Sequence, residues 1–118
     1  MQGQGYGRLV NMASAGVEQL SPALFSTPYA IAKTGIIILT KSLAVAGAKY
    51  GITVNAIAPG YVDKGNLSED ERQKTEKQIP MGRLACAEDI SEAIIFLLSD
   101  RAKYITGACL TISGGWRI

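Results

Sequence analysis

A tyrosine and a lysine four residues apart form the clearest chemical signal in this sequence. Tyr29 and Lys33 stand in the stretch 28–35, and apolar residues follow directly. On an α-helix, positions i and i+4 lie on the same face, so the phenol and the ammonium can point into one site. A nearby ammonium stabilises a phenolate, which makes the pair a candidate general acid/base unit. The alternative is a solvated lysine beside a half-buried tyrosine, because this spacing also occurs by chance.

The composition indicates a chain with a buried core. Hydrophobic residues make up 47% of the 118 residues and charged residues only 19%, which suits one domain or a piece of a larger one. The net charge is +2 without a cluster of Lys or Arg, so we expect no nucleic-acid partner. Residues 1–7 do not resemble a signal peptide, and uninterrupted apolar runs such as 35–39 are far too short to cross a membrane. We therefore expect a cytoplasmic protein without membrane contact.

The absence of histidine narrows the chemistry further. It excludes Ser-His-Asp and Cys-His nucleophiles. The two cysteines, Cys86 and Cys109, are far apart and have no histidine partner, so we expect reduced thiols in or near the core and no metal site. Proton transfer near neutral pH must then use a tuned tyrosine, lysine or carboxylate, which strengthens the case for Tyr29 and Lys33.

Apolar runs and turn residues predict an α/β fold. The expected strands are 8–12, 52–58 and 109–112, and the expected helices are 29–50, 68–78 and 87–98. The strand–helix–strand order implies a right-handed crossover and parallel pairing. In such sheets ligands bind outside the carboxyl ends of the strands. This rule places Ser14 and Pro59-Gly60 at a ligand site, although each could be a simple turn.

Two other segments suggest contacts beyond the sheet. The helix at 29–50 is apolar on more than one face, so we expect it to pack between the sheet and a second helix, which could belong to another subunit. The segment 61–80 is polar and charged. We interpret it as a substrate lid beside the ligand site or as a solvated surface helix, and both interpretations can hold.

Together these blocks resemble the carboxyl-terminal half of a short-chain dehydrogenase/reductase. Residues 7–14 resemble the family strand that ends in the catalytic serine, Tyr29 to Lys33 the YxxxK motif, and 55–60 the strand and Pro-Gly turn beside the nicotinamide. The blocks that resemble the family's tail are 82–84, 88–90, 96–100, 104–107 and 114–115. YxxxK alone is a weak signal, but the ordered set is specific. The 3-oxoacyl-acyl-carrier-protein reductase type is the most similar.

The resemblance implies an oxidoreductase that transfers a hydride between NAD or NADP and a ketone or secondary alcohol, with 3-oxoacyl thioester reduction as a candidate. Tyr29 would act as general acid/base, Lys33 would hydrogen-bond the nicotinamide ribose, and Ser14 would hydrogen-bond the substrate oxygen. The residues expected at the cofactor are Tyr29, Lys33, Pro59, Gly60 and Val62, and those expected at the substrate are Ser14, Ala15, Gly60 and Tyr61.

The sequence departs from the family pattern in three places. Ser14 precedes Tyr29 by 15 residues, slightly more than is common, and Lys64 stands where the family often has threonine. No glycine-rich dinucleotide turn follows a strand, so we expect the amino-terminal half of the Rossmann sheet to lie upstream of Met1. Residues 1–118 would then be the carboxyl-terminal catalytic part of a single Rossmann-like domain, a partial doubly wound parallel sheet. We expect it to bind dinucleotide weakly or not at all by itself, unless a complementary piece or an obligate oligomer supplies the rest.

A second hypothesis keeps the fold and removes the catalysis. The chain could be a truncated, catalytically silent paralog that acts as an oligomerisation or interaction module through its helix faces. Under either hypothesis we expect a homo-oligomer, a dimer or a tetramer. The presence of Ser14, Tyr29 and Lys33 together favours the enzyme, whose partner would be a small carbonyl or alcohol substrate.

Overall fold

The central strand β2, Ile52–Pro59, organises the computed structural model, which describes residues 1–118. It pairs in parallel with β1, Gly7–Met12, along one edge and with β3, Cys109–Ile112, along the other, giving the order β1-β2-β3. The three predicted strands and their parallel pairing are thus confirmed. The resulting α/β arrangement is a partial Rossmann-like sheet.

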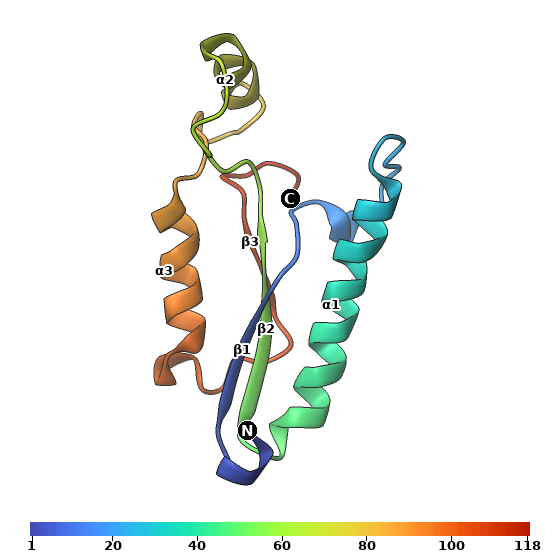
Figure 1. The fold of residues 1–118 in the computed structure, drawn as a ribbon, viewed down its shortest axis with the longest axis vertical. Coiled ribbons are helices and arrows are strands. Elements are labelled where there is room, and N and C mark those ends of the chain that lie inside the picture. The colour runs from blue at the N-terminus through green and yellow to red at the C-terminus, as the bar shows by residue number, and fades with distance from the viewer.

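Two helices cover opposite faces of this sheet (Figure 1). Helix α1, Thr27–Ala48, packs on one face and α3, Ala87–Leu98, on the other. Successive side chains of a strand point to opposite faces, and β2 is buried on both. Its Ala56 contacts the cluster around Ile37 of α1, whereas Ile57 contacts the cluster around Ile90 of α3. The doubly wound arrangement expected from the sequence is therefore present.

Helix α1 starts two residues earlier than predicted, at Thr27. Pro28 occupies the first turn, where its missing N–H costs no hydrogen bond. After the helix, Gly51 has a φ of 70° and leads into β2, as the predicted left-handed turn requires. A Cβ at Gly51 would lie 2.5 Å from the carbonyl oxygen of Gly5, so only glycine fits the turn that joins α1 to the sheet.

Helix α1 is also long and apolar enough to span a membrane by length and composition alone, since it has 22 residues and contains an 18-residue stretch with a mean hydropathy of 1.5. The expectation that no segment reaches this length rested on uninterrupted apolar runs. Thr34 and Lys41 interrupt those runs within the helix, but the mean hydropathy of the stretch still reaches the value typical of a membrane-spanning helix. Core helices of soluble proteins and signal sequences meet the same criteria, and 22% of this stretch is buried, so the finding is only weak evidence for a membrane span.

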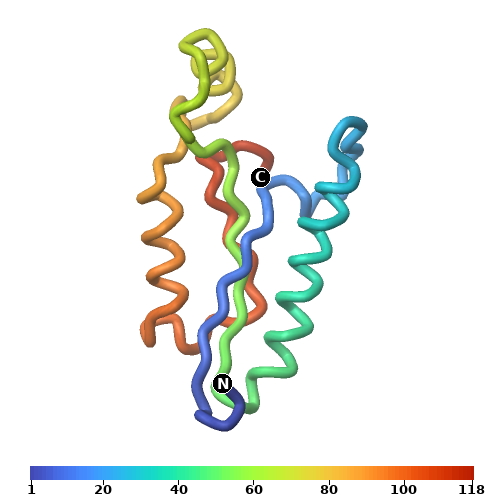
Figure 2. Tube along the Cα trace, viewed as in Figure 1, coloured from blue at the N-terminus to red at the C-terminus, as the bar shows by residue number.

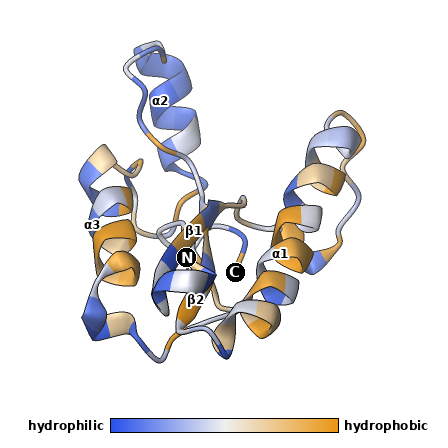
Figure 3. Ribbon diagram, turned by 60° about the horizontal axis from the view of Figure 1, so that its bottom comes forward, coloured by the Kyte–Doolittle hydropathy of each residue, from blue (hydrophilic) through white to orange (hydrophobic).

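Helix α2, Glu69–Glu76, extends away from the sheet (Figure 1) and is hydrophilic along its length (Figure 3). The Ser68 hydroxyl accepts a hydrogen bond from the Glu71 amide, and the Glu71 carboxylate accepts one from the Ser68 amide. This capping box stabilises the helix start. Arg72 anchors the helix by pairing with Asp63 at 2.6 Å. The role of 61–80 as a lid stays a prediction.

The two cysteines lie in different environments. Both are free, but Cys86 is exposed and precedes α3, so its expected place in or near the core is wrong. Its backbone amide donates to the Asp89 carboxylate, which makes Cys86 part of a helix cap. Cys109 starts β3 and is half-buried. Burial, and next the carboxylate of Glu18, raise the pKa of the Cys109 thiol to about 12, so this thiol stays protonated near neutral pH.

Asn55 joins β2 to the segment that leads into β3. It is completely buried. Its side-chain amide donates to the Ile105 carbonyl at 2.8 Å, and its side-chain oxygen accepts from the Ala108 amide at 3.1 Å. Buried polar groups are costly without partners. The Asn55 side chain avoids this cost by bonding to both backbone groups, and it satisfies the Ile105 carbonyl and the Ala108 amide in turn.

Replacing Asn55 with alanine should destabilise the fold by about 2–4 kcal/mol, because it leaves one buried donor and one buried acceptor without partners. Urea unfolding followed by circular dichroism measures the change. Asn66→Ala is the matched control, since Asn66 is exposed and makes no side-chain hydrogen bond. Equal stability of the two variants would contradict the structural role of Asn55.

Candidate active site

A cavity of about 900 Å³ opens where the carboxyl ends of the strands meet the start of α1. The chain segments after β1, β2 and β3 all contribute to it, as ligand sites in parallel sheets require. Figure 2 shows how the segment before α1 and the carboxyl terminus approach the same end of the sheet. The lining residues are 14–17, 20–24, 26–27, 29–31, 34–35, 38, 61 and 116–117.

Ser14 and Ala15 reach the cavity because β1 continues beyond its last ladder residue. The Ala13 amide donates to the Ile57 carbonyl at 2.8 Å, and the Ala15 amide donates to the Pro59 carbonyl at 3.0 Å. These two bonds hold Ser14 in place from both sides. Its hydroxyl makes no hydrogen bond within the chain and lines the cavity, which leaves it available to a ligand.

Tyr29 and Lys33 lie one turn apart on α1, as predicted. The Tyr29 side chain is about half exposed, at 53%, and lines the cavity with no hydrogen bond of its own. The Lys33 ammonium lies 5.7 Å from the centroid of the Tyr29 ring and donates to the Met12 carbonyl at 2.9 Å. Lys33 itself does not line the cavity. The structure therefore brings Ser14 and Tyr29 to one cavity, and the Lys33 ammonium lies near the Tyr29 ring but outside the cavity lining.

Among the residues expected after β2, only Tyr61 lines the cavity. Pro59 ends β2, and the Gly60 amide donates to the Ile112 carbonyl at 2.9 Å. Val62 forms a β-bridge with Ala85 and packs against the core under α3. In this chain Pro59, Gly60 and Val62 thus hold the strand end together, and their predicted contact with a cofactor remains a prediction.

Ionised side chains with strong partners lie outside the cavity. The Arg83 guanidinium, followed by the Cys86 amide, holds the pKa of the Asp89 carboxyl well below its usual range. The Gly65 amide and then Arg72 lower the pKa of Asp63. These acids stabilise turns and helix starts, and neither lines the cavity. The structure contains no group of three His, Cys, Asp or Glu residues that could hold a metal ion.

Comparison with known proteins agrees with this geometry. The family model described as Enoyl-(Acyl carrier protein) reductase matches residues 1–117. A 3-oxoacyl-acyl-carrier-protein reductase FabG from Rickettsia felis is 39% identical over 93% of this chain. A cis-4-hydroxycyclohexanecarboxylate dehydrogenase from Sinomonas cyclohexanicum is 42% identical over 98% of it. The chain belongs to the short-chain dehydrogenase/reductase family.

A solved structure supports the family fold directly. The structure described as a short-chain alcohol dehydrogenase from Sinorhizobium meliloti 1021 superposes with a TM-score of 0.83 at 33% identity and covers 98% of this chain. The match takes up 47% of that protein, and the Rickettsia felis match takes up 46% of its relative. This chain therefore spans about half the length of the short-chain dehydrogenase/reductases that it matches.

The sequence analysis missed two residues of this short-chain dehydrogenase/reductase site, Trp116 and Arg117. Both line the cavity. The Trp116 ring packs on Tyr61 with centroids 4.5 Å apart, and the Arg117 guanidinium lies 4.7 Å from the centroid of the Trp116 ring. The rule that placed Ser14 at a carboxyl strand end also applies after the third strand. The motif Gly114-Gly115 before them was the available signal.

Gly60→Ala should destabilise the strand ends by about 1–3 kcal/mol, because overpacking forces backbone shifts. An added Cβ would lie 2.9 Å from the Cβ and 3.0 Å from the Cα of Ser113, which is part of the backbone and cannot turn away. Thermal unfolding measures the change. Gly3→Ala serves as control, because a Cβ there has open space. Equal melting temperatures for the two variants would contradict the tight packing described at Gly60.

Proposed function

We propose that this chain forms the catalytic and substrate-side part of a cytoplasmic NAD(P)-dependent oxidoreductase that interconverts a ketone and a secondary alcohol. The supporting observation is that Ser14 and Tyr29 line one cavity and their hydroxyls have no hydrogen-bond partner inside the chain, while Lys33 lies one turn further along α1. Family membership over residues 1–117 supports the same assignment.

The residues near Tyr29 fit the nicotinamide end of such a cofactor. The Lys33 ammonium has three donors and uses one of them on the Met12 carbonyl. The other donors can reach ribose hydroxyls, and Tyr29 beside them can contribute its hydroxyl. The cofactor supplies the hydride when bound. The choice between NAD and NADP would depend on residues other than Ser14, the Tyr29–Lys33 motif and the Pro59-Gly60 turn.

Proton transfer is the part of the reaction that this chain's own residues can perform. In reduction, the Tyr29 hydroxyl donates its proton to the carbonyl oxygen as that oxygen gains negative charge, and in oxidation the phenolate takes the proton back. The Ser14 hydroxyl donates a hydrogen bond to the same oxygen and stabilises the developing charge. The Lys33 ammonium near the Tyr29 ring stabilises the phenolate that remains.

The cavity walls favour a largely apolar substrate. Eleven of the twenty lining residues are hydrophobic, and small ligands bind in such apolar sites with a few oriented polar groups. A 3-oxoacyl thioester is our first candidate, because several relatives are named 3-oxoacyl-acyl-carrier-protein reductase. Tyr61 lines the cavity and begins the segment 61–80, so we also propose that α2 moves with substrate entry as a lid.

Tyr29→Phe should lower kcat by about 10²–10⁴, the usual contribution of a positioned proton donor. The assay follows NADPH oxidation with acetoacetyl-CoA, on the protein as its gene encodes it, including any preceding segment. Tyr50→Phe is the matched control, since Tyr50 lies in the turn that follows α1, before β2, and lines no part of the cavity. Full activity of Tyr29→Phe would refute the assignment of Tyr29 as the proton donor.

A second proposal concerns assembly, and one surface supports it. Ile31, Ile38 and Val45 of α1 repeat every seven residues and are exposed by 68%, 63% and 82%; Ile31 and Ile38 also line the cavity, so this interface would border it. Figure 3 shows the apolar colour continuing along the helix away from the sheet. A seven-residue apolar repeat packs well against another helix, so we propose that α1 contacts α1 of a second copy. Without turnover, the chain would act through this interface alone.

Val45→Glu should shift the protein toward the monomer, because a charge at the centre of an apolar interface is costly to bury. Val45 lines no part of the cavity. Light scattering after size exclusion measures the mass. Gln78→Glu adds the same charge at an exposed site after α2 and should leave the mass unchanged. An unaltered oligomer in the Val45 variant would exclude this face as the interface.

A further inference from the structure

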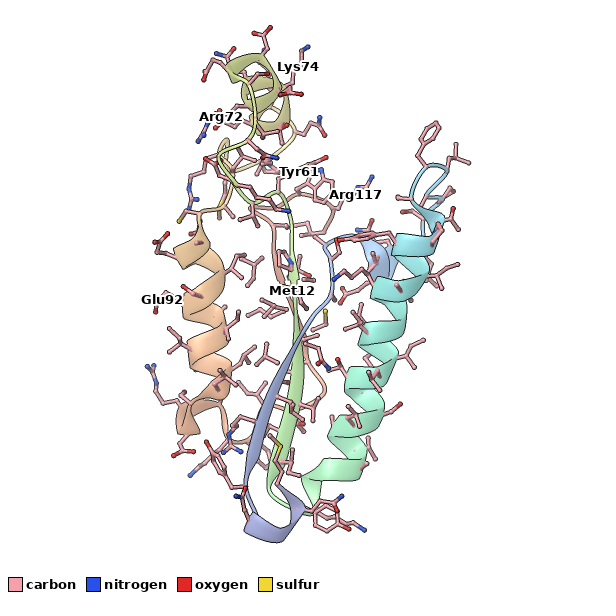
Figure 4. The ribbon with its side chains drawn as sticks, in the orientation of Figure 1. Met12, Tyr61, Arg72, Lys74, Glu92 and Arg117 are labelled. Atoms are coloured by element: carbon pink, nitrogen blue, oxygen red, sulfur yellow. The ribbon has the colours of Figure 1, made fainter.

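Arg117 is the only charged residue that lines the cavity. Every other lining residue is apolar or uncharged, and no aspartate or glutamate is among them. Figure 4 shows Arg117 beside Tyr61 at the end of the sheet where β2 stops. A single cation in an otherwise neutral, largely apolar cavity creates a strong local preference for one anionic group.

The arginine is held in place by its neighbours. Its side-chain stem lies against Gly16, where an added Cβ would come within 2.7 Å of the Arg117 Cδ. Its guanidinium stacks over Trp116, 4.7 Å from the ring centroid, and Trp116 in turn packs on Tyr61. The backbone of Arg117 has a φ of 48°, a strained region that a non-glycine residue rarely adopts. Arg117 is exposed to solvent, but the contacts with Gly16 and Trp116 support its stem and its guanidinium at the edge of the cavity.

The guanidinium has no anionic partner within the chain. Arg8, Arg72 and Arg83 each pair with a carboxylate at 3.3 Å or less. Arg101 also lacks such a partner, but it covers the Phe96 ring away from the cavity. Arg117 therefore combines an unused set of donors with a position on the cavity wall. The planar fork of a guanidinium matches a carboxylate through two parallel hydrogen bonds.

We propose that Arg117 is a specificity-determining residue that favours ketone or alcohol substrates carrying a carboxylate on an apolar body over the 3-oxoacyl thioester that the names of the relatives suggest. The inference rests on the proposed function, because the carboxylate would orient the reacting carbon relative to Tyr29 and Ser14. Trp116 and Gly16 act as positioning residues: the first supports the guanidinium, and the second leaves room for its stem.

Binding can be measured without cofactor and without turnover. Trp116 is the only tryptophan in these 118 residues and lies beside the guanidinium, so its fluorescence reports on this part of the cavity. The probes are cyclohexanecarboxylate, the neutral cyclohexanecarboxamide and inorganic phosphate. We expect saturable quenching by the carboxylate, with the amide and phosphate each binding at least about tenfold more weakly, since a charged hydrogen-bonded pair has roughly this effect.

Arg117→Gln should remove the preference for the carboxylate over the amide, whereas Arg117→Lys should retain part of it because the charge remains. Arg101→Gln is the matched control and should keep the full preference. Near-ultraviolet circular dichroism checks that the variants keep the Trp116 environment. Equal binding of carboxylate and amide by the unmodified protein, or a full preference in Arg117→Gln, would overturn the proposal.

The catalytic proposal fails in a different way. If the protein lacks oxidoreductase activity but shows the carboxylate preference and loses it in Arg117→Gln, the cavity is an anion-selective binding site without catalysis. If Tyr29-dependent turnover is present but carboxylate and amide bind equally, the proposed function stands and the role of Arg117 is refuted. Tight binding of phosphate in place of the carboxylate would also refute it, because the site would then recognise charge alone.

Discussion

The double burial of β2 is the constraint on which this structure depends. The strand is hydrogen-bonded along both edges and covered on both faces, so burial favours side chains that are apolar or hydrogen-bonded, and only the Thr53 hydroxyl is buried there without a partner. Ile57 and Val54 meet the first condition, and Asn55 meets the second through the segment before β3. Since neighbouring strands are parallel, this one strand also fixes where all three carboxyl ends lie.

The cavity follows from that alignment. Ser14 comes after β1, Tyr61 after β2 and Trp116 after β3, so three segments far apart in sequence meet at one end of the sheet. Helix α1 completes the site because it packs along β2 with its first turn at the same end. Ser14 and Tyr29 line the same cavity because the pairing of β1 with β2 and the packing of α1 place them there. No direct contact between the two side chains is needed.

Much of this arrangement could be predicted from the sequence. The strands and helices produce local patterns: β-branched runs for β2, a proline at the start of α1, an acidic first turn for α2. The Tyr29–Lys33 spacing predicted their shared helix face. The position of Ser14 followed from the rule for carboxyl strand ends. These features depend on periodicity and turn chemistry, which a sequence shows directly.

Other features depend on contacts between distant segments, and the sequence could not show them. Trp116 and Arg117 reach the cavity only because Gly16 leaves space for an arginine stem from the end of the chain. A Cβ added at Gly60 would meet Ser113, a contact that the sequence did not indicate; the predicted ligand contact of Gly60 stays a prediction. Cys86 looked like a core thiol and is a helix cap. For Arg117 and Gly60 the contacting residue lies on another segment, which no local pattern indicates, whereas the partner of Cys86 is Asp89 in the first turn of the helix that it caps.

The two halves of the cavity wall differ in how firmly they are attached. Ser14 sits between two ladder amides, whereas Leu24 and Phe25 in the segment before α1 are 86% and 102% exposed. Exposed loop positions tolerate substitution far better than residues bonded to a buried strand. If Ser14 and Tyr29 act in proton transfer as proposed, substitutions in the exposed outer wall could change the substrate over evolutionary time while these two groups stay in place. The boundary between the sheet and its loops would then separate the positions that are constrained by strand pairing from those that are free to vary with the substrate.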